Sequence, residues 1–276
     1  MHNLSGRVAV ITGGAGGIGL GMAKAFANRD MKLVLADMDE ELLAQSEKEL
    51  IDSGAVVVAR RCDVSKLEEV EALAAFTMEQ FGAVNVVCSN AGVGLPTSAR
   101  NMKLPDWEWI LNVDLWGPIY AVKTFLPLLE DQEMGHISAT SSVAGLLSAQ
   151  MMGAYNVAKH GVVALMTSVE RELRAKKSSV HASVLCPGPI NTNISRHSVA
   201  YRPSGGKPKQ DSAKAGKMAK NIQDSLSQGM HPDEVGELVA ESIEQEKFWI
   251  LTHPKFLKLV GKQFETMMED RSLIRV

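Results

Sequence analysis

The chain has 276 residues, of which 45% are hydrophobic and 22% are charged, and this suits one large α/β domain better than two small ones. Its formal net charge is -3 and its longest basic cluster covers only 207–220, so we expect no nucleic-acid partner. The first residues lack the basic-then-apolar layout of a secretion signal, and no window approaches about 18 continuous apolar residues. We therefore expect a soluble, cytoplasmic protein without a membrane partner.

The cysteine and histidine residues give no metal-binding pattern. Cys62, Cys88 and Cys186 are far apart and each lies in an apolar run, which favours buried free thiols over disulfides. The seven histidines have no paired spacing with one another or with cysteine, so we expect no metal site.

Apolar, β-rich runs recur along the chain with helical segments between them. The predicted strands cover 7–12, 32–37, 55–60, 85–89, 136–141, 180–186 and 248–252. The predicted helices cover 19–28, 40–52, 66–81, 106–129, 153–176 and 233–246. The strand runs are continuously apolar rather than alternating, as expected when both faces of a sheet are buried. The pattern predicts a single doubly wound Rossmann-type domain, with about seven parallel strands and helices on both faces.

Two segments depart from this alternation. Residues 195–228 are rich in Ser, Lys, Gly, Gln and Pro and contribute little to a core. A structureless linker is one interpretation, but a lid insertion over about 190–230, with a short amphipathic helix near 213–226, fits a connection within one sheet better. The last residues, about 254–276, predict an amphipathic helical tail that packs on the lid or on a partner subunit.

A glycine-rich loop joins the first predicted strand to the first helix. Gly14, Gly16 and Gly19 fit the pattern GxGxxG, while Gly13, Gly17 and Gly19 fit TGxxxGxG, so the register stays open. Glycines allow the backbone to approach a pyrophosphate, whose charge the helix amino terminus stabilises. Because the loop follows a strand and opens a helix, it predicts dinucleotide binding.

Asp37 ends the second predicted strand, where a carboxylate can accept hydrogen bonds from the adenosine ribose hydroxyls. The same charge repels a 2′-phosphate. Met38 follows Asp37, and no Arg or Lys occurs between Thr12 and Gly21, so NAD is preferred over NADP. The alternative is that Asp37 is only a solvated strand end.

Ser142, Tyr155 and Lys159 have a spacing that suits catalysis. On a helix, Tyr155 and Lys159 lie four residues apart on one face, and the ammonium lowers the pKa of the neighbouring phenol. Such a tyrosine can act as a general acid or base. Taken singly, Ser142 could cap a turn, Tyr155 could pack in a helix and Lys159 could be a solvated charge.

Together these motifs resemble the short-chain dehydrogenase/reductase family, in its short single-domain branch, over the chain to about Thr192. Ser142, Tyr155 and Lys159 match its catalytic set, and Asn112 matches its helix asparagine. The resemblance implies these cofactor-binding residues: Gly13, Gly16, Gly17, Ile18, Gly19, Asp37, Met38, Asp63, Val64, Asn90, Ala91, Gly92, Tyr155, Lys159, Pro187, Gly188, Ile190 and Thr192.

The resemblance also implies a role for each catalytic residue. Tyr155 would donate a proton to a ketone oxygen that Ser142 polarises, and Lys159 would bind the nicotinamide ribose and lower the pKa of Tyr155. Asn112 would help hold a water that relays protons to Lys159, although it could also be an ordinary polar helix residue. A homodimer or homotetramer is implied, with helices 106–129 and 153–176 at the interface.

The residues expected around the substrate are mostly apolar. They are Val93, Gly94, Val143, Leu147, Met151, Met152 and Pro189. We expect NAD-dependent interconversion of a secondary alcohol and its ketone, with a bulky hydrophobic or aromatic substrate. Met151 and Met152 could instead only pack the helix start or a subunit contact. The competing functions are an NAD-retaining epimerase or dehydratase and a non-enzymatic NAD-binding regulator.

Overall fold

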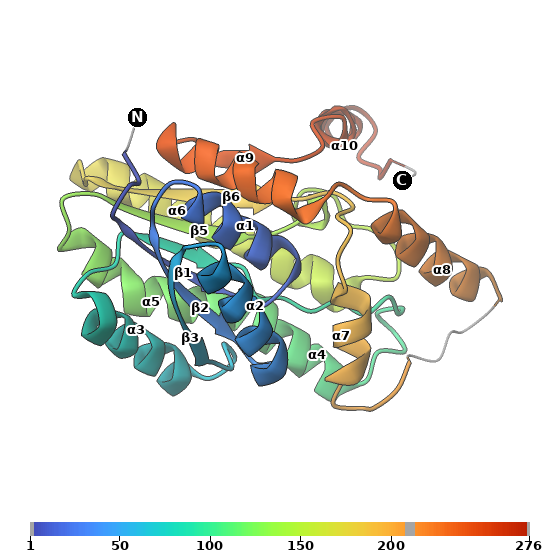
Figure 1. Ribbon diagram of the computed structural model, residues 1–276. Helices are drawn as coiled ribbons and strands as arrows, with labels where there is room; N and C mark the ends of the chain where they lie inside the picture. The colour runs from blue at the N-terminus through green and yellow to red at the C-terminus, as the bar shows by residue number, and fades with distance from the viewer. Residues whose placement is uncertain (1–2, 208–212, 275–276) are drawn as a thin grey trace.

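A seven-stranded parallel sheet forms the centre of the molecule (Figure 1), which the computed structural model describes over residues 3–207 and 213–274. The strands are β1 (Val8–Thr12), β2 (Lys32–Asp37), β3 (Val56–Arg61), β4 (Val86–Ser89), β5 (Gly135–Thr140), β6 (Val180–Cys186) and β7 (Trp249–Leu251). Their order is β3-β2-β1-β4-β5-β6-β7, and every neighbouring pair is parallel. The predicted doubly wound parallel sheet is confirmed.

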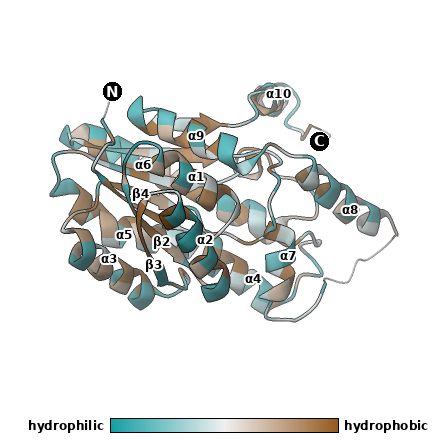
Figure 2. Cartoon of the chain, in the orientation of Figure 1, coloured by the Kyte–Doolittle hydropathy of each residue, from teal (hydrophilic) through white to brown (hydrophobic). Residues whose placement is uncertain are grey.

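Helices cover both faces of this sheet and enclose two apolar cores. On one face lie α1 (Gly17–Ala27), α2 (Glu40–Asp52) and α9 (Pro232–Glu244), whose buried side chains form a cluster with Ile11 and Leu33. On the other lie α3 (Leu67–Phe81), α5 (Gly117–Glu130) and α6 (Gly153–Lys176), around Phe125 and Val87. Figure 2 shows the apolar strands and inner helix faces between hydrophilic outer faces.

The helix predicted over 106–129 is present without a break, but it contains a π-helical turn that the sequence did not predict. The structure has α4 (Leu104–Leu111), a π-helical turn at Asn112–Trp116, and then α5. A π-helical turn inserts an extra residue and redirects the side chains around it, and such turns are frequent at functional sites. Here the turn buries Asp114 completely and leaves Asn112 exposed.

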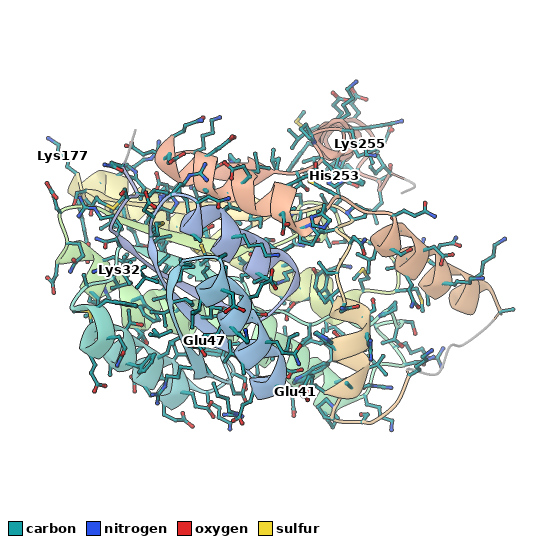
Figure 3. All side chains as sticks on the ribbon, in the orientation of Figure 1. Lys32, Glu41, Glu47, Lys177, His253 and Lys255 are labelled. Carbon is teal, nitrogen blue, oxygen red and sulfur yellow. The ribbon has the colours of Figure 1, made fainter. Side chains whose placement is uncertain are left out.

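The carboxyl ends of the strands carry the irregular part of the molecule. The connecting segment, which we define as residues 190–230 between β6 and α9, contains α7 (Ile194–Ala200) and α8 (Ala213–Ser227), and the chain ends with α10 (Phe256–Glu269). In Figure 3, Lys32 and Lys177, which lie before or at the start of strands, are at the left, while His253, after β7, is at the right. The helices α7, α8 and α10 lie on that right-hand side in Figure 1.

Sequence reasoning placed α8 and α10 closely but gave no helix at α7. The parts of the predicted insertion and tail at 208–212 and 275–276 lie outside the described residues. Within the described ranges, no helix is both long and apolar enough to cross a membrane.

Candidate active site

The glycine loop between β1 and α1 adopts a conformation that needs glycine at particular positions. Gly13 and Gly17 have φ values of +64° and +51°. A Cβ atom on Gly19 would lie 2.0 Å from the carbonyl oxygen of Gly13, so a side chain has no room there. These requirements resolve the open register in favour of Gly13, Gly17 and Gly19, with Gly16 at the N-cap of α1 and Ile18 in its first turn.

Asn90 fixes this loop to the two neighbouring strand ends. Its side-chain amide donates to the carbonyl oxygen of Thr12 at 3.1 Å, and its Oδ1 accepts from the Thr140 hydroxyl at 3.1 Å. The backbone amides of Asn90 and Ala91 donate to the Thr12 hydroxyl at 3.0 and 3.2 Å. The loop backbone is therefore rigid and closely approachable, as the binding of a pyrophosphate requires.

Asp37 lies beside the loop at the end of β2. Its Oδ2 accepts from the backbone amide of Ala15 at 3.2 Å, and its Oδ1 accepts from that of Asp39 at 3.1 Å. Burial raises the pKa of Asp37, and these hydrogen bonds offset part of the rise. A carboxylate so placed fits a ribose diol better than a phosphate.

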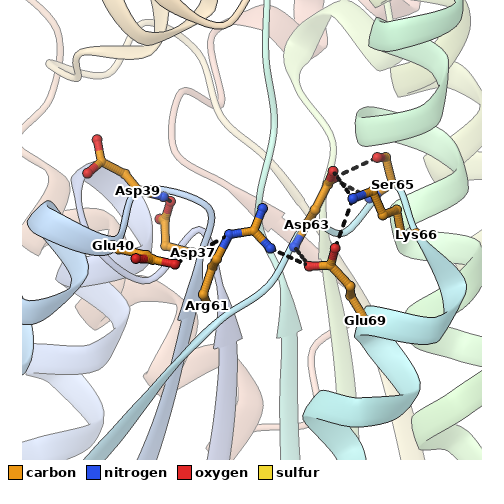
Figure 4. A network of polar contacts seen from close by, with 8 residues as sticks. All are labelled: Asp37, Asp39, Glu40, Arg61, Asp63, Ser65, Lys66 and Glu69. Carbon is orange, nitrogen blue, oxygen red and sulfur yellow. Dashed lines mark hydrogen bonds and ion pairs between the residues drawn. The ribbon is translucent and has the colours of Figure 1, made fainter.

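Arg61, at the end of β3, lies opposite Asp37 in the sheet and was missed by sequence reasoning. Its Nη1 donates to Glu69 Oε2 at 2.8 Å, and its Nε lies 3.6 Å from Glu40 Oε1. Figure 4 shows the guanidinium between these two acids, with Asp63 on the Glu69 side. Arg61, which lies opposite Asp37, is thus already paired with two carboxylates.

Asp63 and Val64 come after Arg61 at the end of β3, and they are the residues expected to contact the adenine. The Asp63 carboxylate accepts from the Ser65 hydroxyl at 2.6 Å, and its backbone amide donates to Glu69 at 2.8 Å. Val64 is buried and packs against Gly117, where a Cβ atom would meet it at 3.1 Å. Met38 is partly buried beside Asp37.

The structure brings Ser142, Tyr155 and Lys159 together. Ser142 caps the 3₁₀ turn Val143–Gly145 after β5, and it forms a hydrogen bond with the Tyr155 side chain. Lys159 Nζ lies 5.5 Å from the centre of the Tyr155 ring. The turn packs tightly on α6, because the Ser141 hydroxyl donates to the carbonyl oxygen of Lys159 at 2.7 Å.

The pKa of Tyr155 is raised, not lowered as the spacing alone suggested. Burial is the largest cause, and Lys159 lowers the pKa without fully offsetting it. The Asp114 carboxylate raises it further, while the hydrogen bond from Ser142 lowers it. Lys159 therefore lowers the pKa of Tyr155 as expected, but burial, Asp114 and Cys186 all raise it.

Asp114, rather than Asn112, contacts Lys159. Lys159 Nζ lies 3.2 Å from Asp114 Oδ2 and donates to the carbonyl oxygen of Thr140 at 3.0 Å. Asn112 is exposed on the same π-helical turn and has no described contact with this group. The extra residue of the turn explains the difference, since it turns Asp114 inward in place of Asn112.

The segment after β6 lies next to the loop and the catalytic group. Thr192 packs on Gly17, whose Cβ would meet the threonine methyl at 3.1 Å. The Ser142 hydroxyl donates to the carbonyl oxygen of Pro187 at 3.4 Å, and the amide of Gly188 donates to Thr252 at 3.0 Å. Ile190 instead is buried in the core, so it supports this segment from below.

The residues expected around a substrate lie in three places: near Ser142 and Tyr155, beside Thr97, and at a pocket next to α8 and α10. Gly94 lies against the Tyr155 ring, and Leu147 and Val143 lie near Ser142 in the chain, Leu147 buried and Val143 partly buried. Met151 has a φ of +62°, and its carbonyl oxygen accepts from the amide of Thr97 at 2.7 Å, while Met152 forms a bridge with Thr97. Pro189 lines a separate pocket of about 300 Å³ with residues of α8 and α10.

A third apolar cluster adjoins the core around Phe125 and Val87, since Val93 and Trp109 pack against both. Its buried members are Leu95, Met102, Ile110 and Ala154, and Val93, Trp107, Trp109 and Val199 pack against it. Val199 belongs to α7, so the connecting segment covers apolar side chains here.

Polar contacts with other elements hold the connecting segment in place. The Ser198 hydroxyl accepts from the amide of Gly94 at 2.8 Å. Arg202 Nη2 lies 2.7 Å from Asp106 Oδ2, and both side chains are buried. Arg202 and Ser204 together lower the pKa of Asp106 despite its burial. The Tyr201 hydroxyl donates to Asp39 at 3.2 Å.

Sequence reasoning missed Asp114, Arg61, Ser198 and Arg202. Only Asp114 left a usable signal, because a carboxylate within the apolar run from Ile110 to Gly117 must find a partner once that run is buried.

Comparison with known proteins agrees with this arrangement. Residues 7–202 match the family model described as short chain dehydrogenase. The 1-deoxy-11-beta-hydroxypentalenate dehydrogenase of Streptomyces exfoliatus is 30% identical, covering 99% of this chain and 92% of its own. The CLA biosynthesis dehydrogenase/reductase of Lactiplantibacillus plantarum is 29% identical, covering 98% and 96%.

Solved structures give the same result with both forms of the cofactor. A short chain dehydrogenase/reductase from Burkholderia phymatum in complex with NAD superposes with a TM-score of 0.95 and 36% identity, over 100% of this chain and 99% of the other. A metagenomic short-chain oxidoreductase in complex with NADP has a TM-score of 0.64 and 32% identity, over 69% and 86%. The chain is therefore an oxidoreductase and belongs to the short-chain dehydrogenase/reductase family.

Proposed function

We propose that the protein interconverts a secondary alcohol and its ketone with NAD(H), and that Tyr155 is the general acid and base. The observation that carries this proposal is the convergence of Ser142, Tyr155 and Lys159 at the carboxyl end of the sheet, beside the glycine loop and Thr192. Ligands of open α/β sheets bind at this end.

Each residue has one task in the proposed reaction. When bound, the nicotinamide supplies a hydride to the carbonyl carbon or takes one from the alcohol carbon. Tyr155 donates its phenol proton to the carbonyl oxygen in reduction and takes the hydroxyl proton in oxidation. Ser142 donates a hydrogen bond to the same oxygen, and Lys159 stabilises the tyrosinate and binds the ribose.

We propose NAD as the preferred form because negative charge surrounds the expected ribose site. Asp37 accepts two backbone hydrogen bonds there, and Arg61 is paired with Glu40 and Glu69. A 2′-phosphate would meet Asp37 without a free guanidinium to balance it. The NAD complex of the Burkholderia phymatum relative supports this choice.

We propose a bulky hydrophobic or aromatic substrate, covered by the connecting segment acting as a lid. The support is the third apolar cluster, which reaches from Val93 to Val199 of α7, together with Leu147 and the methionines before Tyr155. The hydroxypentalenate dehydrogenase among the relatives and the diacetyl reductase of Staphylococcus epidermidis differ in substrate size, so the panel below includes both sizes.

The test follows absorbance at 340 nm with NAD and a panel of aryl, alicyclic and small alcohols. We expect turnover with the larger alcohols, and Tyr155→Phe should abolish it while NADH binding, followed by fluorescence, stays within about threefold. A preference for small polyols would refute the substrate class, and turnover by Tyr155→Phe would refute the mechanism.

We also propose a cytoplasmic homodimer or homotetramer formed through α5, α6 and the π-helical turn. Trp116 on this turn is 46% exposed and Val157 on α6 is 52% exposed, so both elements offer an apolar side chain to a partner subunit. Light scattering should give a mass at least twice that of the chain, and Trp116→Glu should lower it.

A further inference from the structure

We propose that Asp114 is a positioning residue that holds Lys159 in a neutral ion pair and so keeps the Tyr155 phenol protonated at neutral pH. This inference rests on the proposed function of Tyr155 and deepens it. The resemblance implied that Asn112 acts next to Lys159. In the structure the Asp114 carboxylate lies there instead.

Lys159 and Asp114 form a deeply buried ion pair. Lys159 and Asp114 have side-chain exposures of 3% and 0%, and their charged atoms lie 3.2 Å apart. Isolated charges so deeply buried are costly, and each compensates the other. Because α6 carries Lys159 and the π-helical turn carries Asp114, the pair also joins two elements that meet below the site.

The Lys159 ammonium has few hydrogen-bond donors left for a ligand. An ammonium has three N–H groups, and Lys159 Nζ already contacts Asp114 Oδ2 and the carbonyl oxygen of Thr140. Only one donor is left for a cofactor ribose. The contact with Asp114 is an ion pair and uses one of these donors.

Asp114 also contacts the turn that follows β4, which is expected to contact the cofactor. Its Oδ1 accepts from the amide of Val93 at 2.7 Å, directly after Asn90, Ala91 and Gly92. A Cβ on Gly92 would lie 3.3 Å from Lys159 Nζ and 3.6 Å from Asp114 Oδ1, so a glycine leaves room for the pair. Asp114 Oδ2 is buried, and its partner within the described residues is the ion pair with Lys159.

The effect on Tyr155 follows from charge. The charged groups facing the phenol are Lys159 and Asp114, with the Cys186 thiol behind them and the Ser142 hydroxyl beside it. Lys159 alone favours tyrosinate, whereas a neutral Lys159–Asp114 pair gives it much less help. The phenol therefore stays protonated to higher pH, which favours proton donation to a ketone over proton removal from an alcohol.

The test replaces Asp114 by the isosteric Asn. Removing the negative charge leaves Lys159 uncompensated, so the pKa of Tyr155 should fall and the rising limb of the pH profile for alcohol oxidation should move to lower pH. At neutral pH we expect kcat/KM for oxidation to rise roughly five- to tenfold. Glu108→Gln removes an equally negative but exposed side chain of α4 and should leave the profile in place.

A second measurement needs no substrate. Tyrosinate absorbance at 295 nm is titrated in the wild type and in Asp114→Asn, each with a matching Tyr155→Phe background, so that the difference reports Tyr155 alone. A shift of this difference curve to lower pH supports the proposal, even if no alcohol of the panel reacts and the proposed function fails. An unchanged curve, or an effect that follows Asn112→Ala instead, overturns it.

Discussion

The two sides of the site are built from different kinds of contact. On the side of the proposed cofactor, backbone atoms pack directly against backbone atoms, as where Gly19 approaches Gly13. On the substrate side, the connecting segment is held by side chains, chiefly Arg202 on Asp106 and Ser198 on Gly94. Backbone packing fixes one geometry for a constant ligand, whereas side-chain contacts can open and close over a variable one.

Gly19→Ala, on the side of the glycine loop, should have the largest effect. The new Cβ would lie 2.0 Å from the Gly13 carbonyl oxygen, so the loop must move. We expect NADH binding, followed by fluorescence, to weaken about a hundredfold, which is about 2.7 kcal/mol. Gly261→Ala is the control, because that glycine lies within α10 with nothing within 4 Å, and its replacement should leave binding intact. Binding within threefold of the wild type would show that the loop is not rigid.

Arg202→Ala tests the substrate side. It leaves Asp106 buried and unpaired, and the connecting segment can relieve this by opening so that the carboxylate is hydrated. We expect limited proteolysis within 201–207 or 213–227 to become about tenfold faster, which corresponds to about 1.4 kcal/mol of easier opening. Arg196→Ala removes an exposed arginine of α7 as the matched control. Equal cleavage of both variants would mean that the ion pair does not hold the segment.

A smaller effect is expected from Glu40→Gln combined with Glu69→Gln. These changes keep the side-chain shapes but remove the two charges that hold Arg61, which then becomes available to a 2′-phosphate beside Asp37. We expect NADPH binding to tighten about fivefold, or about 1 kcal/mol, with little change for NADH. Glu41→Gln, on the exposed side of the same helix α2, is the control. A uniform change for both cofactors would contradict a role of Arg61 in discrimination.

The smallest effect is expected from Tyr201→Phe. The hydroxyl donates to Asp39 at 3.2 Å on a largely exposed surface, so its loss should cost at most about 0.5 kcal/mol. Thermal unfolding should move by no more than a degree or two, and the proteolysis rate should stay near the wild type. If Tyr201→Phe opens the segment as much as Arg202→Ala, the surface contact and not the buried ion pair is the main attachment.

The sequence predicted what short-range rules determine. Two strands and two helices, among them 32–37 and 153–176, had their observed bounds, because continuous apolar runs and helical periodicity specify them locally. The glycine register needed φ values, and only the structure provides these for Gly13 and Gly17. The π-helical turn was missed because helical periodicity does not mark an extra residue, and the contact of its Asp114 with Lys159 joins residues that are far apart in the chain.

The same reasoning explains which site residues could be named. Ser142, Tyr155 and Lys159 lie within one turn and the start of one helix, so their spacing alone brings them together. Arg61 and Arg202 act through acids on other elements, at Glu69 and Asp106, and no local pattern marks such pairs. Asn112 satisfied the pattern of a helix asparagine, but the turn rotates it into solvent.

Thr140 contacts both the residue that holds the glycine loop and the lysine beside Tyr155. Its hydroxyl donates to Asn90, which holds the glycine loop, and its carbonyl oxygen accepts from Lys159, which lies beside Tyr155, the proposed proton donor. Any displacement at the loop is therefore transmitted through one strand end to the ammonium. A dinucleotide analogue that sits slightly differently on the loop should thus alter the rate of proton transfer as well as its own affinity.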